Sequence, residues 1–148
     1  MKRLSTLTGV ACIGMALGFS SIALANDAKH DHIEEVKKEA MEVRDDHYHV
    51  EPPKTAEAAN ALLKETLAKV EAAYDKGQYE ELHKESYALE AAVDAFRTLK
   101  AHDANLVDEL DESVQTIHYA SEQEDGEVLD ALMPNLRKSA TNVLNDKS

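Results

Sequence analysis

Residues 79–122, YEELHKESYALEAAVDAFRTLKAHDANLVDELDESVQTIHYASE, decide the fold of this chain. Two runs inside this stretch repeat at alternating steps of three and four residues, which is the spacing of one helix face. The runs are Tyr79, Leu82, Ser86, Leu89, Val93 and Phe96, then Val107, Leu110, Val114, Ile117 and Ser121. A short turn at residues 101–103 separates them, and Asp103 is a suitable N-cap for the second run. The stretch therefore predicts a hairpin of two antiparallel helices.

Polar side chains form a stripe beside the apolar face of each predicted helix. Folding the chain at residues 102–103 places each residue opposite the one whose number, added to its own, gives about 205. This register places Tyr87 against His118 and His83 against Glu122. It predicts one polar cluster made of His83, Tyr87, Glu90, His118 and Glu122. If the cluster is purely structural, we expect it to comprise His83, Tyr87, His118, Ser121 and Glu122.

Residues 1–25 are typical of a secretory signal peptide. The basic start Met1-Lys2-Arg3 precedes an apolar stretch, which ends in the A-x-A cleavage site at residues 23–25. The alternative is an uncleaved membrane anchor. The twin arginine of the Tat route is absent, so we expect export to the periplasm through the Sec route. Cys12 is the only cysteine, so the exported chain has no disulfide and no thiolate ligand.

The chain is strongly acidic, with a formal net charge of −13. Nucleic acids and anionic lipid surfaces would be repelled. We therefore expect no nucleic-acid partner and, after signal cleavage, no membrane association. Cations or a basic protein partner are compatible with this charge, as is simple solubility.

The exported chain divides into an arm, a linker and a helical region. Residues 26–50 form an acidic arm that carries four of the seven histidines, His30, His32, His47 and His49. Its apolar helix face is thin, so the arm is expected to dock weakly or to swing free. Residues 51–54 contain Pro52-Pro53 and form a linker.

Residues 55–145 are predicted to form the bundle. Thr55 is a suitable N-cap for an alanine-rich helix that stops at Gly77. A last helix follows Asp125-Gly126, and Pro134 should kink or restart it. Four helices of similar length and short turns predict an all-α, up-down-up-down four-helix bundle, preceded by the signal peptide and the histidine-rich arm.

Two groups of side chains are candidate metal ligands for zinc or copper. One is the arm set, His30, His32, His47 and His49, and the other is the hairpin set, His83, Glu90, His118 and Glu122. The alternative for the arm is surface histidines without a ligand role. The alternative for the hairpin is a hydrogen-bonded network in which His118 bonds Tyr87 and Glu122 bonds His83.

Enzyme chemistry is not expected. The chain has no Gly-x-Ser-x-Gly, no phosphate-binding loop and no H-E-x-x-H. Covalent haem is excluded because Cys-x-x-Cys-His is absent. Non-covalent b-type haem, as in cytochrome b562-like bundles, would need axial ligands such as Met41 or Met133 with His118, and none of these matches the terminal positions used in that family.

Residues 81–92 and 117–122 resemble the signature stretches of a family of small secreted bacterial helical proteins. That family is catalogued as a domain of unknown function, with H-x-x-x-Y-x-L-E and a later H-x-A-S-E. The resemblance covers about residues 51–136 and implies that the family pattern includes His83, Tyr87, Leu89, Glu90, His118, Ser121 and Glu122. It implies no activity.

Two functions are compatible with these observations. The first is a non-enzymatic periplasmic helical protein that binds a divalent metal, zinc or copper, through histidines. The second is a protein-interaction or stress module, similar to a chaperone, without metal.

Overall fold

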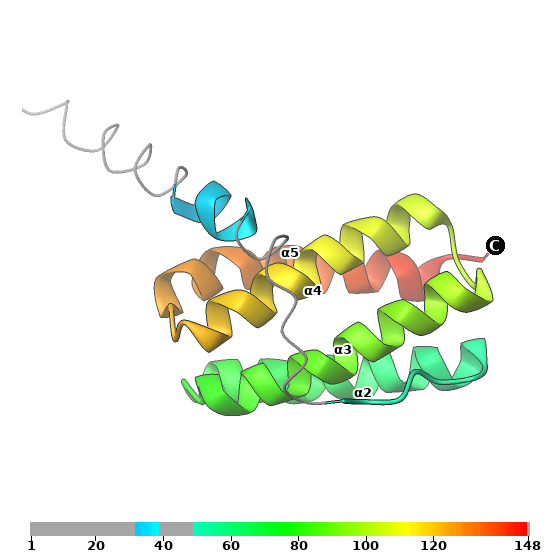
Figure 1. The fold of residues 1–148 in the computed structure, drawn as a ribbon, viewed down its shortest axis with the longest axis horizontal. Helices are drawn as coiled ribbons and strands as arrows, with labels where there is room; N and C mark the ends of the chain where they lie inside the picture. The colour runs from blue at the N-terminus through cyan, green and yellow to red at the C-terminus, as the bar shows by residue number, and fades with distance from the viewer. Residues whose placement is uncertain (1–31, 39–48, 148) are drawn as a thin grey trace, which may run out of the picture.

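The computed structural model describes residues 32–38 and 49–147 (Figure 1). These residues form helices and no strand: α2 (Ala56–Asp75), α3 (Tyr79–Leu99), α4 (Ala104–Glu122), α5 (Gly126–Asn145) and a short helical segment at 32–38. The predicted all-α fold class is confirmed for this part of the chain. The predicted signal peptide, residues 1–25, lies outside the described residues. No described helix is both long enough and apolar enough to cross a membrane.

Short polar side chains begin three of the four long helices. The Thr55 hydroxyl accepts a hydrogen bond from the backbone N–H of Ala58 at 3.2 Å. Asp103 accepts from the N–H of Asn105 at 2.9 Å, and Asp125 caps α5 in the same way. Each cap satisfies a backbone donor that has no partner inside its own helix. The predicted N-caps at Thr55 and Asp103 are therefore confirmed.

Each turn between consecutive long helices contains one residue with left-handed backbone. Gly77, after α2, has φ of 64°, as its position predicted. Lys100 and Glu124 adopt the same region with φ of 51° and 54°, although they carry side chains. Gly126 has another purpose, because a Cβ at this position would collide with the hydroxyl of Tyr79. This glycine allows α5 to start close against the first residue of α3.

Each long helix packs chiefly against its neighbours in the sequence, while α2 and α5 touch only lightly. Figure 1 shows α2 and α3 together on one side and α4 and α5 on the other. The apolar faces predicted from periodicity are buried between them. The largest fully buried side chains include Phe96, Leu63, Leu82, Leu89, Leu110, Ile117, Leu129 and Leu136. Each such side chain contributes about 1.5–3 kcal/mol through removal from water.

Helix α5 continues without a break through Pro134, so the expected restart at this residue is wrong. Proline removes the hydrogen bond to the carbonyl four residues earlier, here that of Asp130. Pro134 and Asp130 are both exposed, so water can solvate the freed carbonyl.

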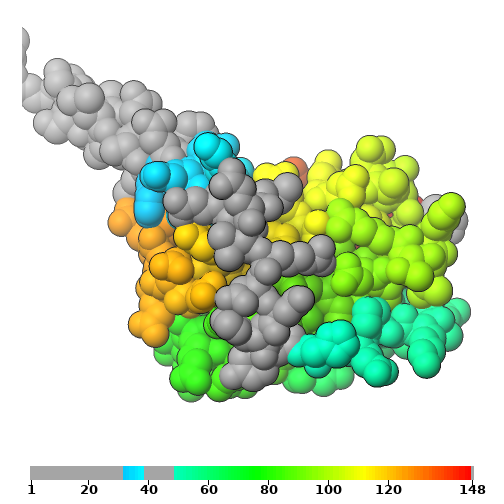
Figure 2. All heavy atoms as spheres, viewed as in Figure 1, coloured from blue at the N-terminus to red at the C-terminus, as the bar shows by residue number. Residues whose placement is uncertain are grey.

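The described part of the arm docks on the bundle. Val36 is only 6% exposed and Ile33 is partly buried against the core. Lys37 lies 3.9 Å from the Glu112 carboxylate of α4, and Figure 2 shows this segment seated on α4 and α5. Of the two alternatives for the arm, docking and swinging free, the structure supports docking for residues 32–38, because Val36 and Ile33 are covered by the core.

Candidate functional site

Four polar side chains meet on the seam between α3 and α4. His83, Tyr87 and Glu90 lie on α3 at spacings of four and three residues, which places them on one side of the helix. His118 faces them from α4. These four residues form the histidine cluster.

The two imidazole rings approach each other through the same atom. The Nε2 atoms of His83 and His118 lie 3.0 Å apart, and the ring centroids are 4.8 Å apart. The phenol oxygen of Tyr87 lies 3.3 Å from the Nε2 of His83. The Nε2 of His83 thus has the Nε2 of His118 and the phenol oxygen of Tyr87 as close neighbours.

A carboxylate fixes the orientation of one ring. Glu90 Oε1 lies in short hydrogen-bond contact with the Nδ1 of His118. A carboxylate can only accept, so the Nδ1 of His118 carries hydrogen. In the neutral ring the Nε2 then presents its lone pair to His83. Either a proton or a metal ion between the two Nε2 atoms satisfies this arrangement, whereas two bare lone pairs do not.

The histidine cluster is largely shielded from water. His118 is 7% exposed and Tyr87 is 4% exposed. The ring of Tyr87 lies edge-on to His118 with centroids 4.5 Å apart, and at 5.4 Å from the ring of His83. Electrostatic interactions are stronger in such surroundings, and an uncompensated charge is costly.

Two serine hydroxyls donate hydrogen bonds to the backbone carbonyls of the two cluster histidines. Ser86 donates to the carbonyl of His83 at 2.6 Å, and Ser121 donates to the carbonyl of His118 at 2.7 Å. Each serine therefore bonds the residue three positions earlier in its own helix. Ser121, predicted as a member of the polar cluster, supports His118 through the main chain.

The predicted partner of His83 requires correction. Tyr87 meets His118 as expected, but His83 lies against His118 and Tyr87, while Glu122 is exposed. The acid in the histidine cluster is Glu90. The predicted register treats the two helices as parallel. Packed helices cross at an angle, which brings side chains from successive turns together diagonally.

The predicted hairpin ligand set also requires correction. Within the described residues, no three His, Cys, Asp or Glu side chains are placed to hold one metal ion. Glu90 binds the ring nitrogen of His118 that points away from His83. Of the set His83, Glu90, His118 and Glu122, only the two histidines direct a donor atom at a common point.

The structure describes only two of the four arm histidines, His32 and His49. His30 and His47 lie outside the described residues, and His49 is exposed. The Nε2 of His32 lies 3.0 Å from the carboxylate of Asp125. This hydrogen bond raises the pKa of His32 and lowers that of Asp125. The four-histidine arm site stays a prediction.

Another histidine, His102, has a role that the sequence does not predict. Its side chain is 6% exposed at the turn between α3 and α4. The Nε2 lies 3.1 Å from the amide oxygen of Asn60, and the Nδ1 lies 3.5 Å from the carboxylate of Asp146. Asp146 also accepts from the backbone N–H of Asp103 at 2.8 Å. These contacts tie the turn to α2 and to the C-terminal end of α5, and no local pattern signals them.

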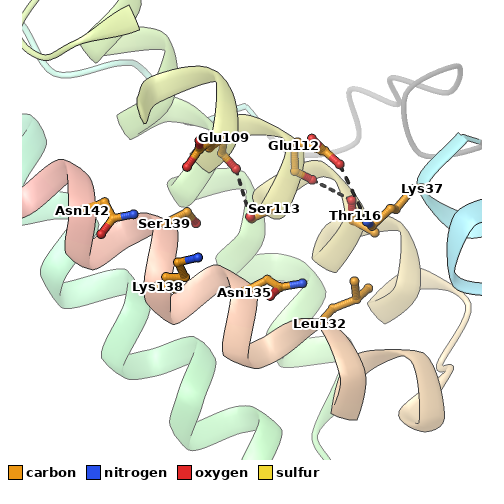
Figure 3. A pocket seen from close by; sticks show the side chains of 10 residues that line it. All are labelled: Lys37, Glu109, Glu112, Ser113, Thr116, Leu132, Asn135, Lys138, Ser139 and Asn142. Carbon is orange, nitrogen blue, oxygen red and sulfur yellow. Dashed lines mark hydrogen bonds and ion pairs between the residues drawn. The ribbon is translucent and has the colours of Figure 1, made fainter. Parts of the chain in front are cut away.

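A polar groove of about 180 Å³ lies between α4 and α5, and Lys37 reaches into it from the arm (Figure 3). Its charges balance, since Lys37 and Lys138 oppose Glu109 and Glu112. The hydroxyls of Ser113 and Thr116 donate to carbonyls of their own helix. No residue of the histidine cluster lines this groove. Because the charges of the groove balance, it favours no particular class of ligand.

Comparisons with known proteins add no relative. No protein-family model matches the chain, and neither curated proteins nor solved structures gave a match. The resemblance to the secreted family of unknown function stays a prediction, and the histidine cluster is the candidate site that the geometry supports.

Proposed function

We propose that this protein is a non-enzymatic, exported helical protein that binds one divalent transition-metal ion, zinc or copper, between His83 and His118. The scaffold that we infer is an up-down-up-down four-helix bundle, in which short turns alternate with helices of 19 to 21 residues. The observation that carries the proposal is the 3.0 Å approach of the two Nε2 atoms.

The ring geometry is consistent with a shared ion. With bonds of about 2.0 Å, usual for zinc and imidazole, a nitrogen separation of 3.0 Å corresponds to about 97° at the ion. Two lone pairs aimed at that ion would hold the ring centroids about 4.7 Å apart, close to the 4.8 Å found. A collinear N–H···N hydrogen bond of the same length would place the centroids about 5.3 Å apart.

The contact between Glu90 and His118 strengthens the proposal. Histidines that bind metals usually donate their other ring N–H to a carboxylate or carbonyl, which fixes the ring and raises its basicity. The Nδ1 of His118 has such a partner in Glu90. The alternative for the same atoms is a shared proton in a purely structural network.

The interaction or stress module is the second candidate, and the net charge of −13 favours it. A surface of this sign attracts basic segments of a partner and repels nucleic acid. This candidate needs no metal, so metal binding separates the two functions.

The test is a zinc titration by calorimetry on the protein with His30, His32, His47 and His49 all replaced by alanine. This background removes competition from the arm. We expect one ion per chain, and loss of binding in His83→Asn and in His118→Gln. Glu122→Gln is the matched control, because this exposed acid lies one helical turn beyond His118, and it should bind as the parent does. Circular dichroism and thermal melts confirm that each variant is folded. Absence of binding in a folded parent, or binding that survives both histidine changes, would refute the proposal.

A further inference from the structure

We infer that the ion is Cu(II) and that the phenolate oxygen of Tyr87 is its third ligand. This inference rests on the proposed metal site between His83 and His118 and adds the identity of the ion and of one more donor.

Tyr87 lies beside the proposed ion site. It follows His83 by one helical turn, so both side chains leave the same face of α3. Its oxygen is 3.3 Å from the Nε2 of His83. Two donors about 2.0 Å from one ion are separated by this distance when the angle at the ion is about 111°. The ring, 4% exposed, is held beside both imidazoles.

The small number of ligands favours copper over zinc. For nitrogen and oxygen donors the affinity of divalent ions rises to Cu(II) and falls again at Zn(II), unless the protein imposes a geometry. A closed tetrahedral cage would impose one. The donors proposed here, two imidazoles and one phenolate, are too few for such a cage, so the intrinsic order applies. Water can complete the coordination of Cu(II) at a site with so few protein ligands.

The charges of the histidine cluster balance when Tyr87 binds as phenolate. Cu(II) brings two positive charges, and the carboxylate of Glu90 and the phenolate bring one negative charge each. Two neutral imidazoles add none, so the shielded cluster is neutral, which avoids the cost of an uncompensated buried charge. The phenol proton passes to solvent when the Cu–O bond forms, and no electron is transferred.

The test is a Cu(II) sulfate titration of the protein without arm histidines, followed by visible absorption and by proton release. We expect a phenolate-to-copper charge-transfer band that saturates at one ion per chain. Tyr87→Phe should lose this band and release one proton fewer per ion, while the histidine pair still binds copper more weakly. Tyr119→Phe removes a neighbouring phenol of α4 and should retain the band. Resonance Raman scattering from bound tyrosinate on the unmodified site supplies a readout that does not depend on a variant folding.

Each outcome decides a separate point. Copper bound with no charge-transfer band, or a band retained in Tyr87→Phe, would overturn the role of Tyr87 and leave the histidine site standing. Zinc that displaces an equal concentration of copper would overturn the choice of ion. If neither ion binds, both this inference and the proposed function fail.

Discussion

Replacement of Glu90 by glutamine removes the negative charge beside His118 but keeps an oxygen that can accept the same hydrogen bond. The Glu90 side chain is 15% exposed and that of His118 is 9% exposed, so their contact is mostly shielded. A hydrogen bond to a charged group contributes about 1.5–3 kcal/mol, and a neutral one about 0.5–1.5 kcal/mol. Glutamine can still accept from the Nδ1 of His118. The expected loss in the free energy of unfolding is therefore about 1–2 kcal/mol.

The measurement is a thermal melt followed by far-UV circular dichroism. For a domain of this size, 1 kcal/mol changes the melting temperature by about 4–8 °C. Glu90→Gln should thus melt at least about 4 °C below the parent. Metal affinity should fall by about 10- to 100-fold, the usual effect of losing a carboxylate that orients a ligand.

The matched control is Glu122→Gln, which removes the same charge from an exposed position of α4. It should change the melting temperature by less than about 4 °C, since surface changes remain near ±0.5 kcal/mol. Equal effects of the two substitutions, or an unchanged melt for Glu90→Gln, would show that the contact with His118 does not hold the ring.

Three further predictions concern other parts of the fold. Gly126→Ala should destabilise by about 1–3 kcal/mol because the new Cβ meets the hydroxyl of Tyr79, and denaturant melts should show much of this loss recovered in a Tyr79→Phe background. Thr66→Val should raise the free energy of unfolding by about 1 kcal/mol, because the buried Oγ1 has no hydrogen-bond partner in the described structure; a lower melting temperature would contradict this. The raised pKa of His32 and the lowered pKa of Asp125 stabilise the docked arm between about pH 4 and 6.5. This stabilisation is lost as the pH rises through the pKa of His32 or falls through that of Asp125, and Asp125→Asn, which still caps α5, should return the NMR titration of His32 to its ordinary range.

Helix faces were predictable because each depends only on residues within its own helix. The periodicity around Leu63 and Val114 marks positions that face the core, and both are fully buried. The turns at Lys100 and Glu124 were not marked as left-handed, because glycine is the usual signal and neither residue is glycine. Local backbone preference was overridden there by the packing of the helices that each turn joins.

The site was only half predictable. The pair of Tyr87 and His118 was expected, because the position of the turn alone places these two residues opposite each other. The choice of Glu90 over Glu122 depends on how α3 and α4 cross, which no residue in either helix encodes alone. The contact of His102 with Asn60 joins positions 42 residues apart, so it appears only once the chain is folded.

The light contact between α2 and α5 has a consequence for how the chain reaches its native state. Nearly all interhelical packing joins elements that are consecutive along the polypeptide, so little loop-closure entropy must be overcome before contacts form. Chains with such low contact order collapse into place within microseconds to milliseconds. The chain can thus fold one hairpin at a time. We expect thermal opening to begin where α2 and α5 meet, since these helices make few contacts.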